Sequence, residues 1–173
     1  MKEMQHYDKA ANKFYQKQRF TSMPVHAWDL FSKNFQKVCT YLSDLNIISK
    51  ISEDKSWEKG VPFEKEILQK KHIVVVTDTN LNIVHATENI YEMNGYTPEE
   101  IKGQRPKIFQ GEKTCRETAS KISDAIKNHQ PFEAVILNYR KDGSTYNCWI
   151  KGGPIRNTKG KVVNFIAFEK EVA

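Results

Sequence analysis

The stretch that decides the fold is Asn138-Tyr139-Arg140-Lys141-Asp142-Gly143-Ser144. Asp-Gly between two runs rich in β-branched and aromatic residues is a strong signal for a β-hairpin turn. The run before the turn, Phe132–Tyr139, and the run after it, Thr145–Ile150, are therefore predicted to pair as antiparallel strands.

Downstream of this hairpin, the sequence predicts one more turn and one more strand. Residues Asn157–Gly160 have the composition of a turn, and Val162–Glu169 is the last apolar run. Pro154 lies between the hairpin and this turn. It either ends the preceding strand or marks a sheet edge, because proline has no N–H to donate to a neighbouring strand.

Upstream, a shorter hairpin is predicted from Ile73–Val76 and Ile83–Ala86, and short helices connect it to the last three strands. These helices are Glu88–Asn94 closed by Gly95, one beginning at the capping box Thr97-Pro98-Glu99-Glu100, and a longer one beginning at the capping box Thr114-Cys115-Arg116-Glu117 and ending before Pro131. The expected fold class is α+β, with an antiparallel five-stranded sheet.

Residues 1–60 are predicted to form an N-terminal helical segment, and residues 61–173 the main domain. Apolar residues at helical spacing are Met4, Tyr7, Ala11 and Phe14, and then Trp28, Phe31, Phe35, Val38, Leu42 and Leu45 in a heptad-like seam. Gly60 and Pro62 mark the boundary. Two interpretations of the seam stay open: a helix packed on the adjoining domain, or a homodimer interface.

Composition and the absence of known sequence motifs argue against several classes of function. The chain has 173 residues and a net charge of +6, with 27 basic and 21 acidic residues mixed along it. No nucleic-acid-binding signature accompanies this charge, so nucleic-acid binding is not expected. No membrane span or signal peptide is apparent, and a cytoplasmic protein is expected. Neither a metal-ligand spacing nor a catalytic motif occurs, so we expect no metal site and no enzymatic activity.

Several separated motifs resemble the PAS domain family. Beyond residues 138–144, they are Asn94-Gly95-Tyr96, Gly103 before Gln104, Pro154-Ile155, Gly160 and Phe165-Ile166-Ala167, in the order that the family has them. The resemblance extends from about Ile73 to Val172. It implies a PAS fold preceded by the helical segment, and a sensory role in signal transduction.

Within that family the chain most resembles light-oxygen-voltage (LOV) domains, which bind a flavin and form a light-driven cysteine adduct. The helix motif Asn-Cys-Arg-Phe-Leu-Gln of those domains corresponds to residues 105–110, and Pro106 takes the place of the reactive cysteine. Gln110 and Asn138 match two flavin-contacting amides. Cys148 and Glu169 replace an asparagine and a glutamine, so half of the amides are lost.

These replacements argue against flavin chemistry. Pro106 has no nucleophile, so an adduct at this position is excluded. A carboxylate offers no N–H to a flavin carbonyl unless it is protonated, and cysteine replaces an amide poorly. We therefore predict no cofactor, and a flavin is disfavoured. The residues expected to line a cavity are Arg105, Pro106, Gln110, Asn138, Cys148 and Glu169.

Two interpretations of Glu169 stay open. In the first, its carboxylate points inward and forms a salt bridge with Arg105 that partly fills the cavity, because an unpaired inward carboxylate would cost several kcal/mol or become protonated. In the second, Glu169 lies near the end of its strand, in water.

The resulting functional hypothesis is a sensory module that binds a small ligand or a protein partner and signals through its N-terminal helices, as a homodimer or on an unidentified partner protein. The alternative is a redox or photosensory protein that holds a flavin, or a haem ligated by His85 or His129, without an adduct. A third hypothesis is an interaction module whose cavity has collapsed. Absorbance of the purified protein distinguishes the first two.

Overall fold

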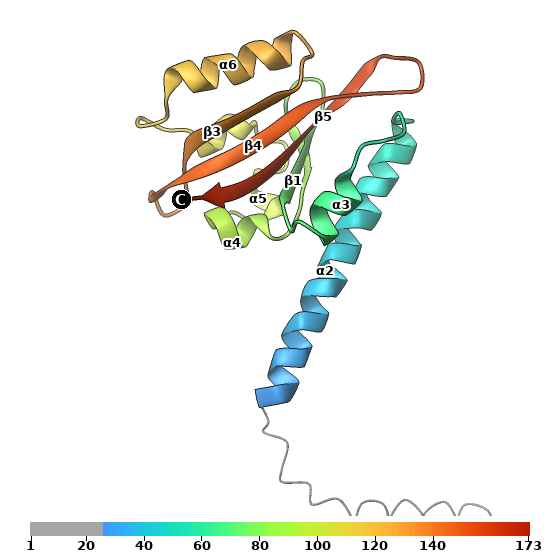
Figure 1. Ribbon diagram of the computed structural model, residues 1–173, viewed down its shortest axis with the longest axis vertical. Coiled ribbons are helices and arrows are strands. Elements are labelled where there is room, and N and C mark those ends of the chain that lie inside the picture. Colours follow the sequence, from blue (N-terminus) through green and yellow to red (C-terminus); the bar gives the residue numbers. More distant parts are fainter. Residues whose placement is uncertain (1–25) are drawn as a thin grey trace, which may run out of the picture. The chain divides into compact units, whose positions relative to one another are not determined.

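The computed structural model describes residues 26–173, apart from the side chains of residues 26–31 and 33. Residues 39–173 form one compact unit by their contacts. In chain order the elements are α2 (His26–Asp54), α3 (Phe63–Leu68), β1 (Ile73–Thr77), β2 (Ile83–Ala86), α4 (Ile90–Asn94), α5 (Pro98–Ile101), the 3-10 helix η1 (Pro106–Phe109), α6 (Arg116–Lys127), β3 (Phe132–Tyr139), β4 (Thr145–Arg156) and β5 (Val162–Val172) (Figure 1).

The five strands form one sheet in the order β2-β1-β5-β4-β3, and all neighbouring strands are antiparallel. The hairpin predicted at Asp142-Gly143 joins β3 to β4, with Tyr139 paired to Thr145. Gly143 has φ +86°, which a residue with a side chain rarely adopts. The predicted α+β fold with a five-stranded antiparallel sheet is confirmed.

Three strands are longer than predicted: β1 by the single residue Thr77, and β4 and β5 by several residues. Strand β4 continues through Pro154 to Arg156, and β5 continues past Glu169 to Val172. Pro154 pairs with Phe165 of β5, but the pairing of β4 with β3 extends only as far as Gly152. At Pro154, strand β4 therefore has no β3 neighbour that would need an N–H donor. Of the two predictions for Pro154, the sheet edge is the correct one.

The short helices confirm one capping box and contradict the other. At α5, the Thr97 side chain accepts from the Glu100 N–H and the Glu100 carboxylate accepts from the Thr97 N–H, as predicted. At α6 the prediction was wrong: the Thr114 hydroxyl donates to the Leu137 carbonyl at 2.8 Å, and the helix begins after Cys115. Helix α3 is an addition to the predicted elements.

Apolar clusters pack on both faces of the sheet, because side chains alternate along each strand. Ile73 and Val75 of β1 face a cluster with α4, α5, η1 and α6. Val74 and Val76 face a second cluster, to which α2 contributes Ile48. All five residues of β1 are consequently buried.

The predicted helix over the heptad-like seam is confirmed for residues 26–54. The second cluster also takes in Tyr41, Leu45, Ile48 and Ile51 of α2. Residues 39–60, which the sequence groups with the N-terminal segment, therefore belong to the compact unit. Phe35, Val38 and Leu42 are exposed by 62%, 52% and 55%.

The helix predicted around Met4 to Phe14 lies outside the described residues. No helix within residues 26–173 is long and apolar enough to cross a bilayer.

Candidate functional site

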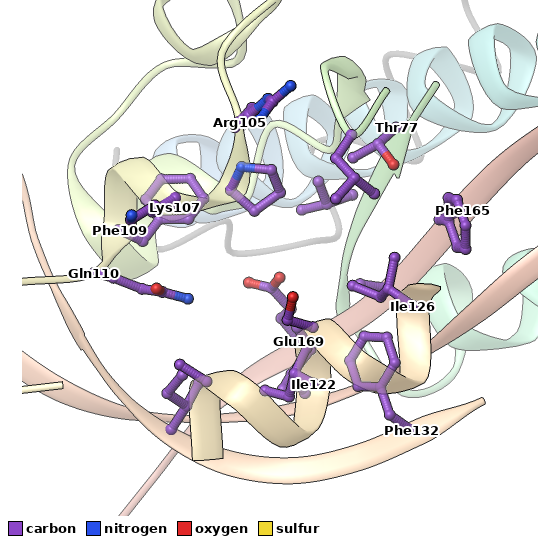
Figure 2. Close-up of a pocket in the computed structure, with 18 of the residues that line it drawn as sticks. Thr77, Arg105, Lys107, Phe109, Gln110, Ile122, Ile126, Phe132, Phe165 and Glu169 are labelled. Carbon is purple, nitrogen blue, oxygen red and sulfur yellow. The ribbon is translucent and has the colours of Figure 1, made fainter. Parts of the chain in front are cut away.

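A cavity of about 300 Å³ lies between the sheet and the helices η1 and α6 (Figure 2). Its apolar lining includes Val75 of β1, Phe109 of η1, Ala119, Ile122 and Ile126 of α6, Phe132 and Ile136 of β3, Ile150 of β4 and Phe165 and Ala167 of β5. Because this cavity is present, the third hypothesis, an interaction module whose cavity has collapsed, is wrong.

The sheet supplies the polar side chains Thr77, Asn138 and Glu169 to this cavity. Each points to the face of the sheet that lines the cavity. Because side chains alternate along a strand, Thr77 lies on the same face of β1 as Ile73 and Val75. Thr77 was not among the predicted site residues, although the same alternation would have identified it. Its hydroxyl is buried without a hydrogen-bond partner among the described residues.

The helical wall supplies Arg105, Pro106 and Gln110. Arg105 precedes η1, Pro106 is its first residue, and Gln110 follows its last turn. Proline at the first position of a helical turn costs no hydrogen bond, which explains why the chain tolerates Pro106 here. Gln110 is half-buried, and its amide extends toward the cavity in Figure 2.

Five of the six predicted cavity residues thus line one space, and the sixth, Cys148, lies beside it. Cys148 is fully buried in the core cluster, with its Sγ atom 3.7 Å from Oε2 of Glu169. Burial raises the pKa of its thiol well above the ordinary range, with the nearby Glu169 carboxylate acting in the same direction. Cys148 is therefore an unreactive neutral thiol, and cofactor binding by the set stays a prediction.

Glu169 is the most unusual residue of the site. Only 4% of it is exposed, and its carboxylate points into the cavity (Figure 2). It pairs with Ile73 of β1 and Ile150 of β4 in the interior of the sheet, so the prediction that it lies in water at a strand end is wrong. Burial raises its pKa from 4.5 to about 7, and the hydrogen bond from Cys148 lowers it only in part.

The predicted salt bridge between Arg105 and Glu169 is also wrong. Arg105 is exposed at the rim of the cavity and directed away from Glu169 in Figure 2. A guanidinium loses less hydration at the rim than it would beside a buried strand, which favours the outward position. Among the described side chains, the hydrogen-bond partner of the Glu169 carboxylate is a thiol, not a cation.

The remaining titratable groups with chemical interest lie elsewhere. His72 contacts Glu66 on α3 at 2.7 Å, and His85 lies 3.3 Å from Asp44 on α2. No group of three or more His, Cys, Asp or Glu side chains in the described part of the chain is arranged to hold a metal ion.

Comparisons with known proteins agree with the geometry. The family model described as "PAS domain" matches residues 71–172. Phototropin-2 of Oryza sativa subsp. japonica is 36% identical over 107 residues, which cover 61% of this chain and 12% of the phototropin. The protein TWIN LOV 1 of Arabidopsis thaliana is 34% identical over 114 residues, which cover 63% of this chain and 29% of that protein. The chain therefore spans less than a third of these relatives.

Solved structures are similar over the same region. A light-oxygen-voltage domain studied with a flavin analogue superimposes with a TM-score of 0.61 at 26% identity, over 64% of this chain and 84% of that one. The dark structure of the blue-light photoreceptor Aureochrome1 LOV gives 0.61 at 27%, over 67% and 86%. With a family model that spans more than half of the chain, we conclude that this protein belongs to the PAS domain family.

Proposed function

We propose that this PAS domain is a sensory module that takes up a small ligand in the cavity and passes its state to the N-terminal helix α2. The observation that carries the proposal is the cavity itself: about 300 Å³ with apolar walls and a few inward polar groups, among them Glu169. A largely apolar pocket with few convergent polar groups is typical of small-molecule sites.

We further propose that the site works without adduct chemistry. The residues of the described chain that line the cavity include no cysteine, and the lining residue Pro106, which takes the place of the reactive cysteine of light-oxygen-voltage domains, has no nucleophile. The donor set also fits a flavin poorly. The pyrimidine edge of a flavin alternates carbonyl oxygens with an N–H, and the Glu169 carboxylate repels a carbonyl when it is ionised.

The contacts of α2 support the proposed route of signalling. Asp44, 1% exposed, accepts a hydrogen bond from the Glu88 N–H at 3.1 Å and lies 3.3 Å from His85 of β2. This buried carboxylate ties the helix to the sheet edge. The exposed seam residues Phe35, Val38 and Leu42 lie beyond that tie on the same helix, and we propose that they pair with a second copy of the chain.

We propose that the protein acts in the cytoplasm, with neither a catalytic role nor a nucleic-acid partner. Its alternative, a flavin- or haem-dependent photosensory or redox protein, is tested by absorbance of the freshly purified full chain. We expect no flavin band and no Soret band, together with a small colourless ligand recovered by native mass spectrometry or a cavity that binds added probes. A stoichiometric coloured cofactor would overturn the proposal.

A further inference from the structure

We infer that the cavity recognises a small flat organic cation, of the amidinium or protonated-amine class, whose N–H groups donate hydrogen bonds to the Glu169 carboxylate. This inference rests on the proposed ligand-binding function and adds the chemistry of the ligand. It follows from an uncompensated acceptor, from the groups that surround it, and from the shape of the space.

The acceptor is built into the fold and lacks a counter-charge. The Glu169 carboxylate has two oxygens that together accept about four hydrogen bonds, whereas its one described partner is the Cys148 thiol at 3.7 Å from Oε2. A thiol is a weak donor. Glu169 is 4% exposed, so bulk solvent barely reaches it. The carboxylate is therefore available to a donor that enters the cavity.

The cations on the neighbouring elements are held elsewhere. The Arg140 guanidinium donates to Glu171 at 2.6 Å and lies 4.6 Å from the centre of the Tyr146 ring. The Lys170 ammonium lies over the Trp149 ring at 5.1 Å, on the other face of the sheet from Glu169. Among residues 26–173, no cation pairs with Glu169, so a bound ligand can supply the missing positive charge.

Two cations at the rim oppose a cationic ligand only weakly. Arg105 and Lys107 line the mouth of the cavity, but both are exposed, so water and salt screen their charge. The uncharged polar groups that face the space are Gln110, Asn138 and Thr77, of which the Thr77 hydroxyl is unpartnered. A buried carboxylate in direct contact outweighs screened charges at the rim.

The walls determine the shape of the ligand. Phe132, Ile136 and Ile150 of the sheet and Ile122 and Ile126 of α6 line the cavity. Because the sheet and the helix both supply apolar side chains, a hydrophobic body such as a planar ring is favoured, and about 300 Å³ is at the lower end of ligand sites. One or two rings carrying a single cationic group fit this description.

The experiment compares benzamidine with benzamide, which has nearly the same shape but no charge, by calorimetric titration of the full chain. At pH 8 we expect benzamidine to bind at least about 10-fold more tightly than benzamide, because its amidinium pairs with an ionised carboxylate. Lowering the pH to 5.5 protonates Glu169 and should weaken benzamidine binding by about 30-fold while leaving benzamide unchanged.

Two variants locate the effect. Glu169→Gln should abolish the preference for benzamidine, whereas the matched control Glu64→Gln, at an exposed position on α3, should retain it. Far-UV circular dichroism checks that both variants fold. If Glu169→Gln does not fold, amide NMR shifts of the unmodified protein take its place, and benzamidine should move the signals of Ala167, Glu169 and Ile150.

Each result has a distinct meaning. Equal binding of both probes, or a preference that survives Glu169→Gln, overturns the cationic ligand class but leaves the proposed function intact. No binding of benzamidine, benzamide or the neutral probe indole at millimolar concentration overturns the ligand class and the proposed ligand-binding function together.

Discussion

Two buried glutamates in this chain are treated in opposite ways. Glu66 on α3 is 7% exposed and is held by the Lys70 ammonium and the His72 ring, each at 2.7 Å. Burial acts to raise the pKa of Glu66, but the hydrogen bonds from Lys70 and His72 outweigh it and the pKa is lowered. Glu169, 4% exposed, has a thiol instead, and its pKa rises to about 7.

The difference in hydrogen-bond partners suggests a structural role for Glu66 and a functional role for Glu169. Glu66 obtains its partners from Lys70 and His72, four and six positions along the chain and just after the end of α3, so nearby residues satisfy its charge. Glu169 lies on the central strand β5, where its neighbours in the sheet, Ile73 and Ile150, are apolar. A buried acceptor left short of partners lowers stability, and proteins retain such groups chiefly at functional sites.

The largest effect is expected from breaking the compensated site. His72→Phe keeps a ring of similar size but removes one of the two hydrogen bonds to the buried Glu66 carboxylate, so the free energy of unfolding should fall by about 3 kcal/mol. Urea denaturation at pH 7 measures this loss. Adding Glu66→Met to this variant should recover most of the loss, because the buried carboxylate that lacks one of its partners is then gone. A double variant no more stable than His72→Phe would contradict this account.

The opposite result is expected at Glu169. Its pKa is raised in the folded protein, so its contribution to stability is full below about pH 4.5 and is lost as the pH rises to about 7. Glu169→Gln removes this loss. The variant should therefore be more stable than the unmodified protein by about 2 kcal/mol at pH 8, and the difference should shrink toward pH 4.5. Urea denaturation across this range tests the sign, which a structural role like that of Glu66 would reverse.

A smaller effect is expected on assembly. Leu42→Glu places a charge in the proposed dimer seam and should weaken self-association by about 10-fold, whereas Ser43→Glu adds the same charge on another side of α2 and should not. Sedimentation equilibrium measures both. If the unmodified chain is monomeric at every concentration, or if the two variants behave alike, the proposed homodimer is wrong.

The smallest effect is expected at the third buried carboxylate, Asp44. Asp44→Asn keeps an oxygen that accepts from the Glu88 N–H but removes the charge beside His85, so the loss of stability should be about 1 kcal/mol. Asp44→Leu, which also removes the acceptor, should cost more. Equal losses in a thermal-denaturation series would indicate that the charge, not the hydrogen bond, ties α2 to the sheet.

The sequence predicted the fold well because turns and alternation are local signals. Asp142-Gly143 placed the β3–β4 hairpin, and the inward set of β3 followed from a period of two. The environment of Glu169 was not predicted, because it depends on where β5 ends. A strand that ended at residue 169 would leave Glu169 at the strand end, whereas Lys170–Val172 extend the pairing with β4 and place Glu169 in the interior of the sheet.

The alternation of β5 has a mechanical consequence. Glu169 faces the cavity, and its neighbour Phe168 belongs to the cluster that contains Ile48 of α2 on the other face of the sheet. One peptide unit therefore separates the ligand side from the helix side. A twist of β5 that accompanied a change of charge at Glu169 would displace Phe168 as well, because a densely packed interior does not absorb such a displacement. The signal that we propose would then cross the thickness of one strand.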